Sequence, residues 1–142
     1  MANRQLVVFK IGNEEYAIPI EQVKEIIDYL PVTTLPDTPA YFEGIIDVRG
    51  KIIPIINLAA KIGRIADETR QIVIVDIHNK AVGLTVGTVT EVVQAIDDNF
   101  EDLELVGFPI QNTKTVCKLQ NRIIILLDVE KNLLDAVTVN PD

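Results

Sequence analysis

The same pattern of short, β-branched segments occurs twice in the sequence, and this duplication restricts the possible folds more than any other feature. Residues 5–27 align without a gap with residues 71–93. A second block, residues 51–58, resembles residues 122–129 and follows in the same order. Chance similarity between short strands accounts for one such match but poorly for two in matched order. We therefore infer an internal duplication.

Turn signals between alternating apolar residues predict two β-hairpins in the first repeat. The first hairpin covers residues 5–20 and turns at residues 12–14, where glycine and asparagine occur. The second covers residues 44–56 and turns at Arg49-Gly50. The duplication predicts matching hairpins in the second repeat.

Two short helices are also expected. The apolar residues at positions 23, 26, 27 and 30 have helical spacing, which predicts a helix over residues 21–28. Asn57 is a suitable N-cap for a second helix over residues 58–62, and Gly63 is suited to end it.

Strand content and composition together indicate an all-β fold. Each repeat holds about five short strands, which is the content of a small closed barrel. Two repeats are too few for a solenoid, whose units need several neighbours. Hydrophobic residues make up 48% of the chain but aromatic residues only 5%, so Ile, Val and Leu must fill the core. We expect two small barrels side by side, each hiding one apolar face against the other.

The sequence offers no group that supports catalysis or metal binding. Its one histidine, His78, falls in a predicted turn, and its one cysteine, Cys117, falls in a predicted strand, where packing is the expected role. The acidic stretch at residues 97–104 lacks the ligand spacing and the glycine of an EF-hand calcium loop. Gly83 and Gly87 are too sparse for a phosphate-binding loop. We predict that the protein is not an enzyme and uses no cofactor and no metal.

Charge and hydropathy limit the kinds of partner. The chain has 13 basic and 21 acidic residues and a net charge of −8, which disfavours binding to nucleic acid and to anionic lipid. No apolar run approaches the roughly 20 residues of a membrane span, and the first residues lack the core of a signal peptide. We expect a cytoplasmic protein, without membrane insertion, that presents surfaces to other proteins. Arg49, displayed at a tight turn, is the best single candidate for such a contact.

Three stretches of the chain resemble the CheW family: residues 14–26, residues 38–58 and residues 122–131. The middle stretch is the most specific, because it combines a Pro-Ala-aromatic motif, a glycine, an Arg-Gly turn and a later proline. The resemblance extends over residues 5–136, nearly the whole chain.

The resemblance implies one CheW-like domain over residues 1–142, built from two tandem five-stranded SH3-like β-barrels with short helices. Family structure places the first barrel at residues 12–66. It places the second barrel at residues 67–136, with residues 5–11 added as a strand that ties the two together.

The resemblance also implies a function. CheW proteins are adaptors that link chemoreceptors to the histidine kinase CheA in bacterial and archaeal chemotaxis, so we expect a non-catalytic adaptor recruited to membrane receptor arrays. Its partners would be the CheA regulatory domain and the cytoplasmic tip of methyl-accepting chemoreceptors. An alternative is a CheW-like scaffold for a non-chemotactic kinase pathway. A small-molecule-binding barrel or an enzyme would need convergent polar groups, and His, Cys and aromatic residues are scarce.

Candidate site residues carry over from the family motifs. The expected kinase contacts are Val23, Glu25 and Gly44, and the expected receptor contacts are Arg49, Ile52, Leu84 and Val86, the last three in a groove between the barrels. The family commonly has Asn-Leu where this chain has Asp47-Val48, and we expect Asp47 to pair with Arg49. Residues 100–114 match the family poorly and receive no site.

Overall fold

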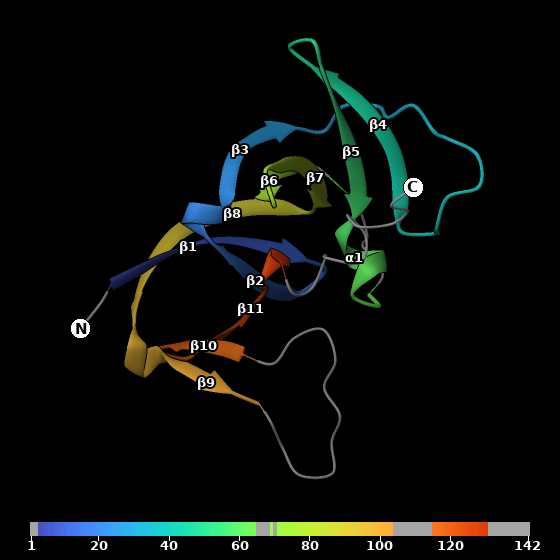
Figure 1. Cartoon of the computed structure of the whole chain (residues 1–142). Coiled ribbons are helices and arrows are strands. Elements are labelled where there is room, and N and C mark those ends of the chain that lie inside the picture. The colour runs from blue at the N-terminus through green and yellow to red at the C-terminus, as the bar shows by residue number, and fades with distance from the viewer. Residues whose placement is uncertain (1–2, 65–68, 70, 104–114, 131–142) are drawn as a thin grey trace.

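The computed structural model describes residues 3–64, 69, 71–103 and 115–130. Figure 1 shows these residues arranged as strands with a few short helical turns. In the first repeat the elements are β1 (Asn3–Ile11), β2 (Glu14–Pro19), η1 (Ile20–Gln22), β3 (Val23–Asp28), β4 (Phe42–Val48), β5 (Lys51–Asn57) and α1 (Leu58–Lys61). In the second they are β6 (Gln71–Ile77), β7 (Lys80–Val86), β8 (Thr88–Ile96), η2 (Asp97–Asn99), β9 (Phe100–Asp102), β10 (Thr115–Leu119) and β11 (Arg122–Leu126).

The strands of the described residues form two sheets, and the two repeats exchange their first hairpins between these sheets. Sheet A has the order β8-β1-β2-β11-β10-β9, and sheet B has the order β3-β6-β7-β5-β4. The β1–β2 hairpin of the first repeat therefore pairs with strands of the second repeat. The β6–β7 hairpin of the second repeat pairs in the same way with β3 and β5 of the first. The internal duplication is thus visible as two sheets with equivalent strand orders.

This exchange divides the chain differently from the expected barrels. The expected first barrel, residues 12–66, included β2, but β2 pairs with β1 and β11 in sheet A. The expected second barrel, residues 5–11 with 67–136, included β6 and β7, but both lie in sheet B. The physical reason is the tightness of the hairpin turns, which keep both of their strands in one sheet. His78 and Asn79 have φ angles of 51° and 67°, the left-handed conformation that such turns use.

The predicted helix over residues 21–28 is wrong, because β3 occupies Val23–Asp28. Side chains along β3 alternate between half-buried and exposed, which is the period of a strand. Antiparallel pairing with β6 decides the outcome over the local helical spacing. The prediction for Asn57 is confirmed: its side chain accepts a hydrogen bond from the Ala60 N–H at 3.1 Å and caps α1.

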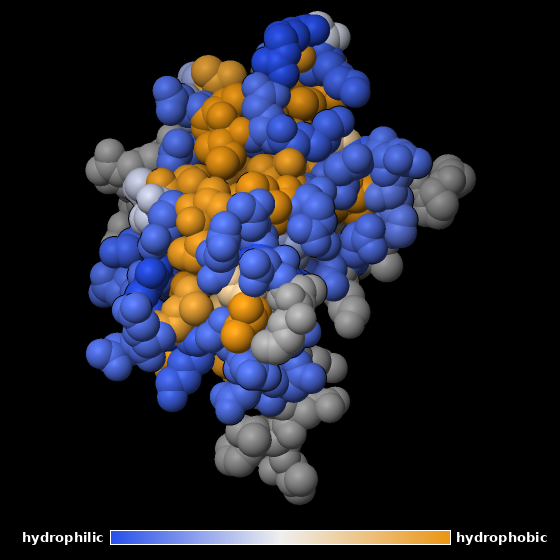
Figure 2. Space-filling view, turned by 90° about the vertical axis from the view of Figure 1, so that its left-hand side faces the viewer, coloured by the Kyte–Doolittle hydropathy of each residue, from blue (hydrophilic) through white to orange (hydrophobic). Residues whose placement is uncertain are grey.

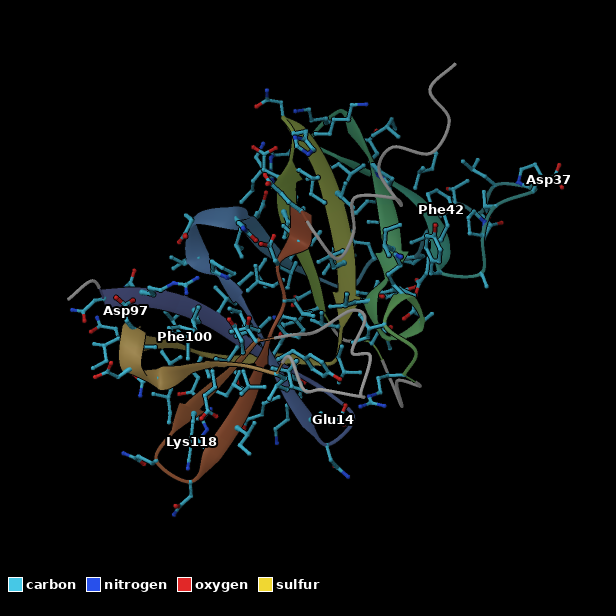
Figure 3. The ribbon with its side chains drawn as sticks, turned by 60° about the horizontal axis from the view of Figure 1, so that its bottom comes forward. Glu14, Asp37, Phe42, Asp97, Phe100 and Lys118 are labelled. Atoms are coloured by element: carbon cyan, nitrogen blue, oxygen red, sulfur yellow. The ribbon has the colours of Figure 1, made fainter. Side chains whose placement is uncertain are left out.

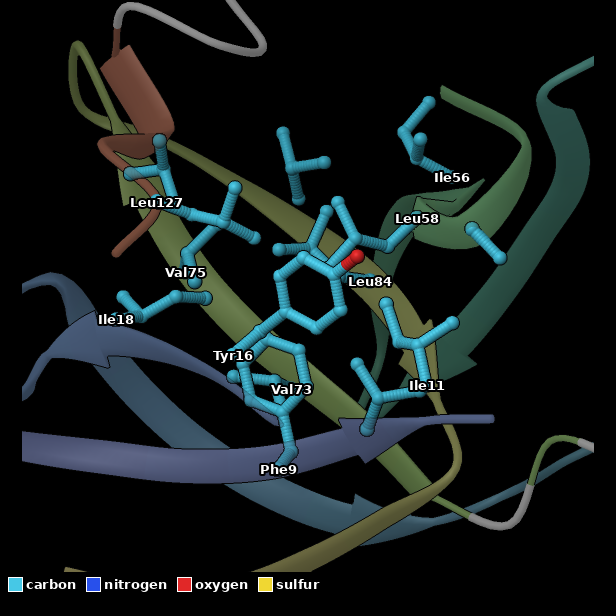
Figure 4. Packing of buried hydrophobic residues seen from close by; sticks show 14 of the residues in the cluster. Phe9, Ile11, Tyr16, Ile18, Ile56, Leu58, Val73, Val75, Leu84 and Leu127 are labelled. Atoms are coloured by element: carbon cyan, nitrogen blue, oxygen red, sulfur yellow. The ribbon is translucent and has the colours of Figure 1, made fainter. Parts of the chain in front are cut away.

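Among the described residues, three groups of buried side chains form the core. Sheet A encloses one group that includes Leu6, Val8, Cys117 and Ile124, and sheet B encloses another group of isoleucines. A larger central cluster lies between the sheets and contains side chains from both exchanged hairpins, among them Phe9, Tyr16, Val73 and Leu84 (Figure 4). The hairpin strands are therefore buried on both faces, which explains their continuous apolar sequence. The all-β fold of two sheets with short helices is confirmed.

Candidate protein-interaction surfaces

The β4–β5 hairpin displays Arg49 at its tip. Arg49 and Gly50 have φ angles of 53° and 85°, so the turn is a tight left-handed one. The Asp47 side chain accepts a hydrogen bond from the Gly50 N–H at 2.7 Å and does not pair with Arg49, so that expectation is wrong. Arg49 pairs instead with a residue on a strand far away in the sequence.

That partner is Glu25 on β3. The guanidinium of Arg49 donates from Nη1 to Oε2 of Glu25 at 3.0 Å and from Nη2 to Oε1 at 2.5 Å. These hydrogen bonds, with the favourable charge, lower the pKa of the Glu25 carboxyl and raise the pKa of Arg49. The Arg49 side chain is 71% exposed, so water screens the pair and it contributes little to folding. Its effect is to hold the guanidinium in one orientation at the surface.

Gly44 lies in β4, where the backbone of Thr33 leaves no room for a side chain. Its φ is 150°, and a Cβ atom there would lie 2.3 Å from the Thr33 carbonyl oxygen. Thr33 and Ile45 exchange two backbone hydrogen bonds of 2.9 Å, which fix the segment before β4 against the strand. The glycine therefore allows a close approach within this chain, and Gly44 is buried.

Two further predicted contacts lie on the same sheet, at different depths. Val23 begins β3, is half-buried and packs against the central cluster. Ile52 in β5 is 58% exposed and borders a shallow pocket with Leu30 and Pro31. Figure 2 views the side on which β3 and β8 lie in Figure 1 and shows hydrophobic side chains gathered in a band across it.

Leu84 and Val86 do not line a surface groove. Their side chains are 0% and 1% exposed and belong to the central cluster. The reason is the position of β7, which has β6 on one side and β5 on the other and is covered on both faces. Because both side chains are buried, neither is available to a receptor in this arrangement, and what the structure shows for both is a packing role in the central cluster.

The structure thus brings together residues that the sequence assigned to different partners. Glu25, an expected kinase contact, and Arg49, an expected receptor contact, form one ion pair. The sequence did not predict a second network of ion pairs. In it, Arg122 on β11 donates to Glu15 at 2.9 Å and to Glu91 at 2.6 Å. The repeat alignment carried a signal for it, because Glu91 aligns with Glu25.

The described residues contain no cluster of His, Cys, Asp or Glu side chains suited to hold a metal ion. Within the same part of the chain, no helix has the length and apolar character that crossing a membrane requires. What the surfaces described above offer is non-covalent recognition, through the exposed Arg49 guanidinium and the exposed aliphatic side chain of Ile52.

Comparison with known proteins identifies the family. The family model described as a CheW-like domain matches residues 5–137. The chain belongs to the CheW family. This CheW-family chain is 32% identical over 133 residues to a probable chemotaxis protein CheW of Rhizobium etli, covering 90% of this chain and 86% of that one. It is 30% identical over 138 residues to the chemotaxis protein CheW of Thermotoga maritima, covering 95% and 90%.

A solved structure agrees with the sequence relatives. The scaffolding protein CheW from Thermoanaerobacter tengcongensis superposes on this CheW-family chain with a TM-score of 0.83 and 29% sequence identity. The match covers 93% of each chain. The resemblance inferred from the sequence motifs is therefore confirmed for both family and fold.

Proposed function

We propose that this CheW-family chain is a non-catalytic adaptor that couples methyl-accepting chemoreceptors to the histidine kinase CheA at membrane receptor arrays. Membership of the family over residues 5–137 carries the proposal. The exposed Arg49 guanidinium, held by Glu25, and the exposed side chain of Ile52 on the same hairpin supply a surface suited to a protein partner. An adaptor of this kind changes the activity of the kinase only through different affinities for its conformational states.

The two faces of the adaptor lie on sheet B. We assign the CheA regulatory domain to Val23 and Glu25 on β3. Gly44, which is buried, supports this face by letting β4 approach the segment around Thr33. We assign the receptor tip to Arg49 and Ile52 on the β4–β5 hairpin. Because Glu25 and Arg49 are ion-paired, the two faces share a boundary, and a partner that engages one residue alters the environment of the other.

Calorimetric titration tests the kinase face. The purified chain is titrated with the regulatory domain of CheA from the same organism, beside a Val23→Asp variant checked by circular dichroism. The control is Ile123→Ser, at a 64% exposed position of β11 in sheet A, the sheet that carries none of the proposed contacts. We expect binding by the wild type and the control, and loss of binding in a folded Val23→Asp variant. If the wild type released no heat on titration with a correctly folded CheA regulatory domain, CheA would not be the partner.

A second titration tests the receptor face with a soluble fragment of a chemoreceptor that contains its cytoplasmic tip. Arg49→Glu should abolish binding of this fragment, because reversing the charge places a carboxylate beside Glu25. Ile52→Ser should weaken it, because an exposed aliphatic side chain is removed from the contact. Unchanged affinity in both variants would exclude this hairpin as the receptor face.

A further inference from the structure

Arg49 lies in the tight turn at the tip of the β4–β5 hairpin. Its φ of 53° is left-handed, which is unfavourable for a residue with a side chain. The Asp47 carboxylate accepts the Gly50 N–H at 2.7 Å and so bridges the turn from the residue that precedes Val48. Asp47 is exposed, and its neighbour across the ladder is Ile52. Asp47 therefore caps the turn and lies opposite the aliphatic residue of the proposed receptor face.

The second repeat contains the same turn without this hydrogen bond. Gln120 has a φ of 54°, almost the same as Arg49, and occupies the equivalent place between β10 and β11. Lys118 pairs with Ile123 as Asp47 pairs with Ile52, so Lys118 is the counterpart of Asp47 near the end of β10 (Figure 3). A lysine ammonium has no acceptor and cannot bind the N–H of the turn. The hairpin therefore forms its turn without such a cap.

We infer that Asp47 is a positioning residue for partner recognition: by accepting the Gly50 N–H it holds Arg49 in the orientation that meets Glu25 and the receptor tip. This inference rests on the proposed function. The equivalent hairpin reaches the same backbone conformation with lysine in that place, so the Asp47 hydrogen bond is not required to form the turn; its role is to restrict the motion of the turn around Arg49. An asparagine at position 47 retains a side-chain oxygen acceptor, whereas alanine does not.

Two variants test this in the complete chain. Asp47→Ala should weaken binding of the receptor-tip fragment by about fivefold to tenfold, since the hydrogen bond that orients the guanidinium is lost. Asp47→Asn should restore affinity to within about twofold of the wild type. The matched control is Lys118→Ala at the equivalent place in the other hairpin, which should leave affinity unchanged. Unfolding midpoints in urea should agree among all four proteins.

A double variant separates positioning from direct contact. If Asp47 acts through Arg49, adding Asp47→Ala to Arg49→Ala should cause no further loss of affinity. Additive losses, equal losses in Asp47→Ala and Asp47→Asn, or unchanged binding in Asp47→Ala would each overturn the inference. The first two of these results would instead point to direct contact by the Asp47 carboxylate.

A measurement on the free chain keeps this test independent of the proposed function. Nuclear magnetic resonance of the Arg49 guanidinium should show protected Nη–H protons in the wild type and in Asp47→Asn, and faster exchange in Asp47→Ala. Equal exchange in all three proteins would overturn the positioning role whether or not the receptor fragment binds. Failure of the wild type to bind that fragment, with the exchange pattern as expected, would count against the proposed function alone.

Discussion

Arg64 donates its Nε–H to the Glu14 carboxylate at 2.7 Å, which ties the segment after α1 to the start of β2. Figure 3 labels Glu14 there. The same carboxylate oxygen accepts a hydrogen bond from the Tyr16 hydroxyl, with 2.5 Å between the two oxygens. Arg64 also donates from Nε to the Tyr16 oxygen, at 3.3 Å. The Tyr16 ring is buried in the central cluster. This network therefore links the first repeat's last segment to the hairpin that the repeat contributes to sheet A.

The network makes stability depend on pH in a defined direction. The hydrogen bond from Tyr16, aided by Arg64, lowers the pKa of Glu14 below its ordinary value of 4.5. A carboxyl whose pKa is lower in the folded state stabilises the fold above its unfolded pKa, and this stabilisation is lost as pH falls through the folded pKa. We expect the difference in unfolding free energy between wild type and Glu14→Gln to be present at pH 6–7 and to shrink as the pH falls below about 4.5. Urea unfolding of both proteins across this range checks it, and a constant difference would contradict it.

Gly44 should tolerate no side chain. Gly44→Ala brings a Cβ atom to 2.3 Å from the Thr33 carbonyl oxygen at a φ of 150°, so the segment around Thr33 must move. We expect a loss of more than about 2 kcal/mol in unfolding free energy. The control is Gly12→Ala, at a φ of 62° with no atom within 4 Å of the new Cβ, which should cost about 1 kcal/mol. Equal losses in the two variants would show that the contact with Thr33 is not what constrains Gly44.

Leu84 and Ile52 should behave in opposite ways, although the sequence assigned both to the receptor face. Leu84→Ala leaves a cavity in the central cluster and should destabilise the chain by about 2–5 kcal/mol. Ile52→Ala removes an exposed side chain and should change stability by no more than about 0.5 kcal/mol. Thermal or urea unfolding distinguishes them. A small effect for Leu84→Ala would mean that β7 is exposed in solution.

The Glu25–Arg49 ion pair should couple the two proposed faces. Arg49→Glu is expected to weaken binding of the CheA regulatory domain as well as the receptor fragment, because it places two carboxylates together at the boundary. Exchanging the charges in the double variant Glu25→Arg/Arg49→Glu should recover part of the lost affinity. A double-mutant cycle measured by calorimetry checks this, and strictly additive effects would show that the pair does not couple the faces. All variants should keep the melting temperature nearly unchanged, since the pair is exposed.

The elements that the sequence predicted correctly are those specified by neighbouring residues. The hairpin turns at Gly12 and His78 and the cap at Asn57 follow from local backbone chemistry, and all were found in place. The helix predicted over residues 21–28 failed because pairing with β6, more than forty residues later, outweighs local spacing. The spacing of apolar residues within a segment does not show which distant strand will pair with it.

The candidate site was predictable in part for the same reason. Arg49 follows from its turn, but its pairing with Glu25 joins two residues 24 positions apart and needs the sheet to be assembled. The burial of Leu84 depends on β7 lying between two strands, which alternation along one strand does not reveal. The repeat alignment likewise shows which segments are equivalent, but it does not show whether a hairpin pairs with strands of its own repeat or of the other one. The hairpin exchange could therefore not be predicted from it.

The hairpin exchange predicts that neither repeat folds alone. Within the described part of the chain, four strand pairings connect the repeats: β1 with β8, β3 with β6, β5 with β7, and β2 with β11. A chain cut between the repeats, giving residues 1–66 and 67–142, leaves each half without the hairpin that completes its sheet and with the central cluster open to water. We expect each half to lack a cooperative unfolding transition and the mixed halves to recover the circular dichroism spectrum of the intact chain. If residues 1–66 unfolded cooperatively by themselves, the first repeat would form a complete sheet from its own strands, and the exchange would not describe the protein in solution.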